Sequence, residues 1–140
     1  MKPKGKTPRI LVVDDEEEFQ SLVAEHLRYE KYEVSLASDG LQGLDSARKN
    51  PPDLIIADLA MPNLDGIGML KALRTDDRFC KIPVIVLSVM VEKNDKQRAF
   101  EAGAAAFLNK PCGIEELLDA IKACLRGDRP LASPIPKPGV

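Results

Sequence analysis

Apolar residues follow two alternating patterns along this chain. Five short stretches are almost continuously apolar and rich in β-branched residues, which is typical of strands that are buried on both faces. These predicted strands are residues 10–14, 34–37, 54–58, 83–88 and 106–108. After each of them a longer stretch predicts a helix, in most cases because apolar residues recur every three or four positions. These predicted helices are residues 16–30, 41–47, 67–73, 93–102 and 114–125.

The alternation of strand and helix predicts an α/β fold. Continuous apolar strands occur in parallel sheets covered by helices, and right-handed crossovers between such strands favour a doubly wound sheet. We therefore expect a (βα)5 architecture, with a five-stranded parallel sheet sandwiched by helices. In the first helix Phe19, Leu22, Val23 and Leu27 lie at helical spacing, and Asp65 is a candidate N-cap for the third.

Length and composition limit the number of domains and the class of partner. The 140 residues suffice for one domain, expected over residues 9–126, with a flexible basic tail at 1–8 and a proline-rich tail or linker at 127–140. A net charge of −2 and only two Tyr, four Phe and no Trp favour neither nucleic acid nor membrane as a partner. Three cysteines without a Cys-x-x-Cys motif, and no signal-like leader, favour a cytoplasmic location.

Carboxylate, hydroxyl and ammonium side chains lie at the ends of the predicted strands. Asp14 and Asp15 end the first strand, Asp58 the third and Ser88 the fourth, and Lys110 follows the fifth. Since these ends meet at one edge of a parallel sheet, we expect the side chains to converge. Three carboxylates would repel one another, and Mg²⁺, which takes oxygen ligands, would neutralise them. Such a set can receive a phosphoryl group on an aspartate.

Each of these residues also has an ordinary structural explanation. Asp14 and Asp15 are consistent with an N-cap of the first helix, and Asp58 with a turn residue at a strand end. Ser88 by itself is consistent with a hydroxyl that only satisfies a hydrogen bond. The hypothesis of a functional site therefore depends on the joint placement of all these residues at strand ends.

Longer segments around these residues share a family pattern. They read Ile-Leu-Val-Val-Asp-Asp-Glu at 10–16, Pro-Asp-Leu-Ile-Ile-Ala-Asp-Leu-Ala-Met-Pro-Asn-Leu-Asp-Gly at 52–66, Ile-Pro-Val-Ile-Val-Leu-Ser at 82–88, Gly-Ala at 103–104 and Phe-Leu-Asn-Lys-Pro at 107–111. Over about residues 9–126 the chain resembles the receiver domain of two-component response regulators, of the kind found in chemotaxis regulators. The resemblance implies a flavodoxin-like sheet with strand order 2-1-3-4-5.

The resemblance also implies the residues of a phosphoacceptor and metal site. Asp58 matches the phosphoacceptor. Asp15 and Asp58 match direct Mg²⁺ ligands, Asp14 matches an acid that acts mostly through water, and the backbone carbonyl of Ala60 matches a further ligand.

The family pattern implies a switch beside that site. Ser88 matches the hydroxyl that hydrogen-bonds a phosphoryl oxygen, and Lys110 matches the lysine that pairs with the phosphoryl group. Phe107 matches the aromatic residue whose rotamer follows the hydroxyl. The Lys110–Pro111 peptide bond matches one that is usually cis in the family.

Four positions depart from the common pattern of the family. Val89 stands where Ala or Gly is usual, Cys112 stands where Phe is usual, and Ala60 and Met90 are apolar where polar side chains are frequent. Because polar side chains beside the phosphoryl group can position the water that hydrolyses it, we expect a long-lived phosphorylated state. We expect Val89 to slow loading from small donors.

The implied function is a phosphorylation-dependent switch, with no catalysis beyond its own phosphotransfer and slow autodephosphorylation. The expected donor is a sensor histidine kinase or a histidine phosphotransfer protein. The expected readout is binding of a downstream partner to the face of the fourth helix, fifth strand and fifth helix. A homodimer that forms on phosphorylation is an alternative readout.

Two other functions share part of this residue pattern. A haloacid-dehalogenase-type phosphatase also uses a nucleophilic Asp, a hydroxyl, a Lys and Mg²⁺, but it needs a second Asp where this chain has Ala60. A degenerate receiver that serves only as a docking module would not need to retain the full set of polar residues at the strand ends.

Overall fold

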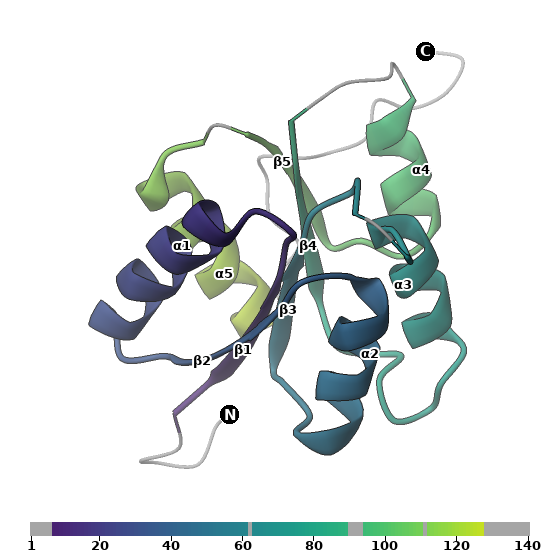
Figure 1. The fold of residues 1–140 in the computed structure, drawn as a ribbon, viewed down its shortest axis with the longest axis horizontal. Helices are drawn as coiled ribbons and strands as arrows, with labels where there is room; N and C mark the ends of the chain where they lie inside the picture. The colour runs from purple at the N-terminus through teal and green to yellow at the C-terminus, as the bar shows by residue number, and fades with distance from the viewer. Residues whose placement is uncertain (1–6, 62, 90–93, 111, 128–140) are drawn as a thin grey trace.

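Five parallel strands form one sheet in the order β2-β1-β3-β4-β5 in the computed structural model, which describes residues 7–61, 63–89, 94–110 and 112–127 (Figure 1). The strands are β1 (Arg9–Val13), β2 (Glu33–Ala37), β3 (Leu54–Ala57), β4 (Val84–Ser88) and β5 (Ala106–Asn109). The helices are α1 (Glu17–Tyr29), α2 (Gly40–Lys49), α3 (Gly66–Arg74), α4 (Asp95–Glu101) and α5 (Ile114–Arg126). The predicted α/β class, parallel sheet and strand order are confirmed.

Helices cover both faces of the sheet and divide the core in two. Figure 1 shows α1 and α5 on one face and α2, α3 and α4 on the other. Because side chains alternate along a strand, Leu11 and Val13 of β1 belong to one apolar cluster and Ile10 and Val12 to the other. The sequence shows this as a run without polar positions, since both faces of the strand are buried.

Two apolar residues in the predicted helices lie at the surface. Leu22 of α1 is 54% exposed, and Leu41 of α2 is 56% exposed. In α1 the buried stripe instead includes Gln20, whose side-chain amide donates to the carbonyl of Ala37 at 2.5 Å. A hydrogen-bonded amide can lie in the core at little cost, so Gln20 shares the buried side of α1 with Val23, Ala24 and Leu27.

The strand register brings the carboxyl ends of all five strands to one edge of the sheet. Val13 pairs with both Ala37 and Ala57, and Ser88 pairs with Asn109. Backbone hydrogen bonds continue past the strand ends, from Asp14 to Ala37 at 3.0 Å, from Asp58 to Val13 at 3.0 Å and from Lys110 to Ser88 at 2.7 Å. These bonds hold the polar residues that follow the strands within one layer.

Some predictions concern residues that the structure does not describe. These residues include 1–6, Met90, Pro111 and the proline-rich segment from residue 128 onward. The predicted cis peptide bond and the predicted tails therefore stay predictions. The predicted start of the fourth helix at residue 93 also falls outside, and the described helix begins at Asp95. Among the described helices, none combines the length and apolar character needed to cross a membrane.

Candidate functional site

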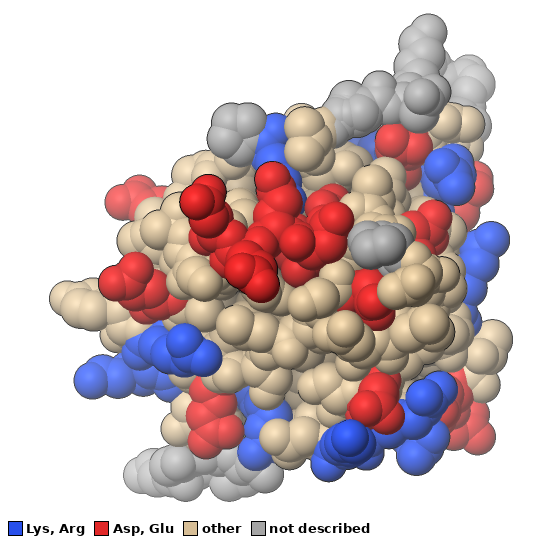
Figure 2. All heavy atoms as spheres, viewed as in Figure 1, with Lys and Arg blue, Asp and Glu red and all other residues tan. Residues whose placement is uncertain are grey.

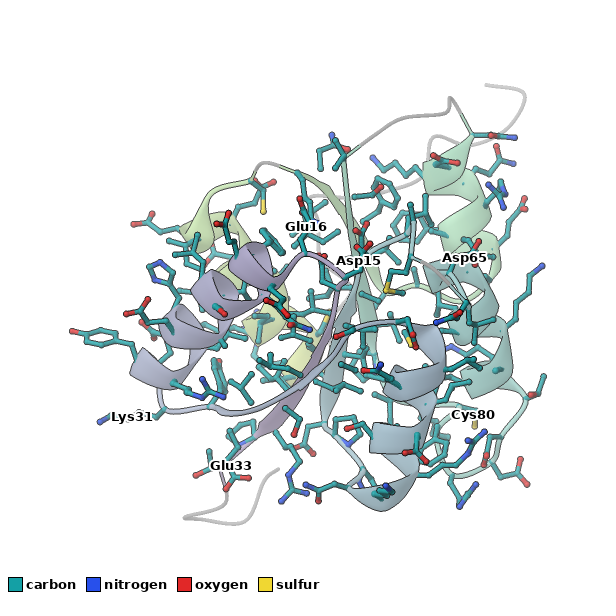
Figure 3. The ribbon with its side chains drawn as sticks, in the orientation of Figure 1. Asp15, Glu16, Lys31, Glu33, Asp65 and Cys80 are labelled. Carbon is teal, nitrogen blue, oxygen red and sulfur yellow. The ribbon has the colours of Figure 1, made fainter. Side chains whose placement is uncertain are left out.

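Three carboxylates meet at the carboxyl edge of the sheet. Asp14 and Asp15 follow β1 and Asp58 follows β3, and each offers an oxygen within 4.8 Å of those of the other two. Asp14 and Asp58 are buried, whereas Asp15 is exposed. Figure 2 shows acidic side chains gathered at this end of the molecule, and Figure 3 shows Asp15 and Glu16 beside the end of β1.

The ammonium group of Lys110 lies among these acids. Its Nζ is 2.7 Å from Asp14 Oδ2, 3.3 Å from Asp58 Oδ2 and 3.1 Å from Glu16 Oε1, and the side chain is only 7% exposed. The same Nζ lies 4.2 Å from the centroid of the Phe19 ring, a distance at which a cation is attracted to the ring face. The end of β5 thus supplies a buried positive charge to the acids that follow β1 and β3.

Opposing effects set the ionisation of this cluster. Burial raises the pKa of Asp58 and the charge of Asp14 raises it further, and together they outweigh the lowering effect of Lys110. Burial would lower the pKa of Lys110, but the hydrogen bond that Lys110 donates to Asp14 and the charges of both aspartates raise it above its ordinary value. Burial therefore affects the pKa of Asp58 more than the neighbouring lysine does.

The side chain of Asp14 does not cap α1. The N-cap residue is Glu16, which makes no side-chain capping hydrogen bond. Asp14 Oδ1 instead accepts from the backbone N–H of Glu16 at 2.9 Å, while its Oδ2 accepts from Lys110. These two hydrogen bonds, one to each oxygen, hold the Asp14 carboxylate in a fixed orientation at the cluster.

The donor set fits a hard divalent cation. All three carboxylates offer oxygen, the ligand that Mg²⁺ and Ca²⁺ prefer, and the residual negative charge favours another cation. The exposed Asp15 leaves one side of the cluster open to solvent. The loop after Asp58 also approaches the site, since the N–H of Ala60 lies 3.4 Å from Asp58 Oδ1.

The remaining predicted residues lie near the same edge. Ser88 ends β4 and is 5% exposed, and Phe107 of β5 is buried within the core cluster that α2, α3 and α4 cover. Val89 is 63% exposed, so its side chain lies at the surface immediately after Ser88. Cys112 is partly buried, and burial raises the pKa of its thiol.

The sequence prediction missed four contributors. Glu16 and Phe19 contact Lys110 across the chain, and no local pattern signals such contacts. Asp39 and Asn63 hydrogen-bond one another beside the loop that follows Asp58. Asp39 had a readable signal, because an Asp before the first residue of a helix is a preferred N-cap.

Comparison with known proteins identifies the family. A family model described as the response regulator receiver domain matches residues 10–122. This chain belongs to the response regulator receiver domain family. The predicted resemblance is confirmed, and neither the phosphatase nor the docking-module alternative gains support.

Individual relatives agree with the receiver assignment. The DNA-binding dual master transcriptional regulator RpaA of Synechocystis is 40% identical over 119 residues, which are 85% of this chain and 49% of RpaA. A putative response regulator from Chloroflexus aurantiacus has a similar structure, with 32% identity, a TM-score of 0.83, and coverage of 86% of this chain and 99% of that one. The receiver domain of the sensor histidine kinase PA1611 from Pseudomonas aeruginosa has 28% identity and a TM-score of 0.80, covering 86% of this chain and 99% of its own. The chain spans about half the length of the curated relatives that it matches.

Proposed function

We propose that this receiver domain accepts a phosphoryl group on Asp58 and thereby switches a downstream interaction. The observation that carries the proposal is the position of Asp58, at the end of the central strand, with a lysine ammonium 3.3 Å from its carboxylate and two further acids beside it. The expected donor is the phosphohistidine of a sensor kinase or of a histidine phosphotransfer protein.

The transfer needs little covalent chemistry from the protein. An Asp58 oxygen attacks phosphorus, the bond from phosphorus to the donor nitrogen breaks, and the imidazole leaves with its electron pair. Lys110 is placed to pair with the phosphoryl oxygens, because its Nζ already contacts the Asp58 carboxylate. Asp14, Asp15, Asp58 and the carbonyl of Ala60 would hold Mg²⁺, which supplies charge neutralisation to the phosphoryl group. The structure of the PA1611 receiver contains a magnesium ion in its active-site cleft, which supports this choice of metal.

The switch is proposed to start at β4 and β5. A phosphoryl oxygen near Asp58 would attract the hydroxyl of Ser88 and the ammonium of Lys110. The backbone N–H of Lys110 already donates to the carbonyl of Ser88 at 2.7 Å. Movement of Ser88 would change the space available to Phe107 and bias the arrangement of α4. We propose that a partner, or a second copy of the chain, reads the face formed by α4, β5 and α5. The free state of the three cysteines fits a reducing cytoplasm.

Phosphorylation of Asp58 can be tested directly. The protein is incubated with Mg²⁺ and a small phosphodonor such as acetyl phosphate, and the adduct is located by mass spectrometry. We expect wild type and Asp45→Asn to gain one phosphoryl group, because Asp45 lies on the exposed side of α2, and Asp58→Asn to gain none. A phosphoryl group of equal yield on Asp58→Asn, unaffected by EDTA, would contradict the proposal.

A further inference from the structure

A buried carboxylate and an exposed side-chain amide join the start of α2 to the loop that follows β3. The side-chain amide of Asn63 donates to Asp39 Oδ2 at 2.6 Å, and Asp39 is 6% exposed. Asp39 Oδ1 accepts from the backbone N–H of Gln42 at 2.8 Å, which caps α2. Both hydrogen bonds lower the pKa of Asp39, the backbone bond more strongly. One carboxylate thus caps a helix and binds a loop 24 residues away.

A second contact joins the same two segments. The N–H of Gly40 donates to the carbonyl of Leu64 at 3.0 Å, and a Cβ at position 40 would collide with that carbonyl. Asn63 has a φ of +67°, a left-handed conformation that Asn tolerates better than most residues. The loop therefore adopts an uncommon backbone conformation where it meets α2, at the residue whose side-chain amide donates to Asp39.

The anchored end of the loop is connected directly to the residues that follow β3. The N–H of Gly66 donates to the carbonyl of Leu59 at 2.9 Å, so residues 64–66 are tied back to the segment beside Asp58. The position of Leu59 and Ala60 thus depends on where the start of α2 holds residues 63–66. Neither Asp39 nor Asn63 is among the carboxylates of the cluster.

We propose that Asp39 and Asn63 are positioning residues for metal binding. By fixing the loop after β3, they hold the backbone of Ala60 in place, and neither of them is itself a proposed metal ligand. The inference rests on the proposed function, in which the carbonyl of Ala60 is a ligand. Removal of polar residues that orient a metal ligand without contacting the metal typically weakens metal affinity by about 10–100-fold.

The test measures Mg²⁺ affinity by following backbone amide shifts in NMR titrations of the intact chain. Asn63→Gly removes the amide but keeps the left-handed conformation accessible, and Asp39→Ser removes the partner of Asn63 but keeps an N-cap for α2. We expect each to weaken Mg²⁺ binding about tenfold, and the double variant to be no weaker than either. Asp65→Ser is the matched control, because Asp65 lies in the same loop and caps α3 through the N–H of Gly68, and the Mg²⁺ affinity of this variant should equal that of wild type.

The outcomes separate this inference from the proposed function. If wild type binds Mg²⁺ and Asn63→Gly or Asp39→Ser binds it equally well, the positioning role is wrong. Weakening of the same size in Asp65→Ser would show general damage to the loop and would also overturn it. If wild type itself shows no Mg²⁺ binding, the proposed function fails before the variants are compared. Circular dichroism of each variant confirms that the fold is retained.

Discussion

At the scale of single residues, Lys110 links acids that come from two strand ends. The buried Asp14 and Asp58 both contact its ammonium. Glu16, whose side chain is 64% exposed, contacts the same ammonium from the surface. The exposed pair contributes little, since such pairs are typically worth about 0.2–1 kcal/mol. The buried contacts therefore determine where Lys110 lies, and that position fits pairing with a group attached to Asp58.

The side chain at position 60 is expected to set the lifetime of the phosphorylated state. Ala60 is exposed and cannot hold a water in line with phosphorus. We predict that Ala60→Asn shortens the lifetime about tenfold, equivalent to about 1.4 kcal/mol of transition-state stabilisation, while its backbone carbonyl is retained. The measurement follows loss of the acyl phosphate after the donor is removed.

The control for this prediction is Val89→Ala. Because Val89 is exposed beside Ser88, its truncation should speed loading from acetyl phosphate and leave the lifetime nearly unchanged. Decay that is equally fast in wild type and Ala60→Asn would show that this side chain does not control the attacking water.

At the scale of elements, the two glycines that cap α5 differ in backbone conformation. Gly127 caps the C-terminus of α5 with a φ of +89°, whereas Gly113 caps its N-terminus in an extended conformation with a φ of −70°. A Cβ added at either glycine would meet nothing within 4 Å. The two positions therefore differ in backbone conformation and not in available space.

This difference predicts opposite tolerance to alanine. Gly127→Ala should lower the free energy of unfolding by about 1–2 kcal/mol, because alanine is strained in the left-handed region. Gly113→Ala should change it by less than about 0.5 kcal/mol, since reduced freedom of the unfolded chain offsets the poorer N-cap. Chemical denaturation measures both, and equal values for the two variants would contradict the role assigned to the αL conformation.

At the scale of the whole molecule, the overall charge is nearly balanced but unevenly distributed. The net charge is −2, yet three carboxylates meet at one end of the sheet. A cation that binds only the folded protein stabilises it by mass action, by about 2.7 kcal/mol at 100 times its dissociation constant. Binding of a cation at the acidic edge would therefore stabilise the folded protein.

We predict that Mg²⁺ raises the thermal midpoint of unfolding of wild type. Asp15→Asn should reduce the rise, because it removes an exposed ligand without disturbing the contacts of Lys110. NaCl of equal ionic strength is the control for screening. A rise of the same size with NaCl would show that the effect is general electrostatic screening and not metal binding.

Much of the fold was readable from the sequence because its signals are local. Strands buried on both faces require uninterrupted apolar runs, and Asp65 precedes α3 as the capping pattern predicts. The polar residues that end these runs must lie at one edge of any parallel sheet. The sequence by itself thus determined the order of elements, the α/β class and the members of the acidic cluster.

Only the tertiary structure decided which residues face one another across the chain. Gln20 is buried while Leu22 is exposed, and the amide of Gln20 donates to the carbonyl of Ala37. Glu16 meets Lys110, and Asp39 meets Asn63, through pairings 94 and 24 residues apart. Hydropathy records the preference of each side chain for water or core, but these contacts depend on strand register and loop conformation, which arise only when the whole sheet has formed.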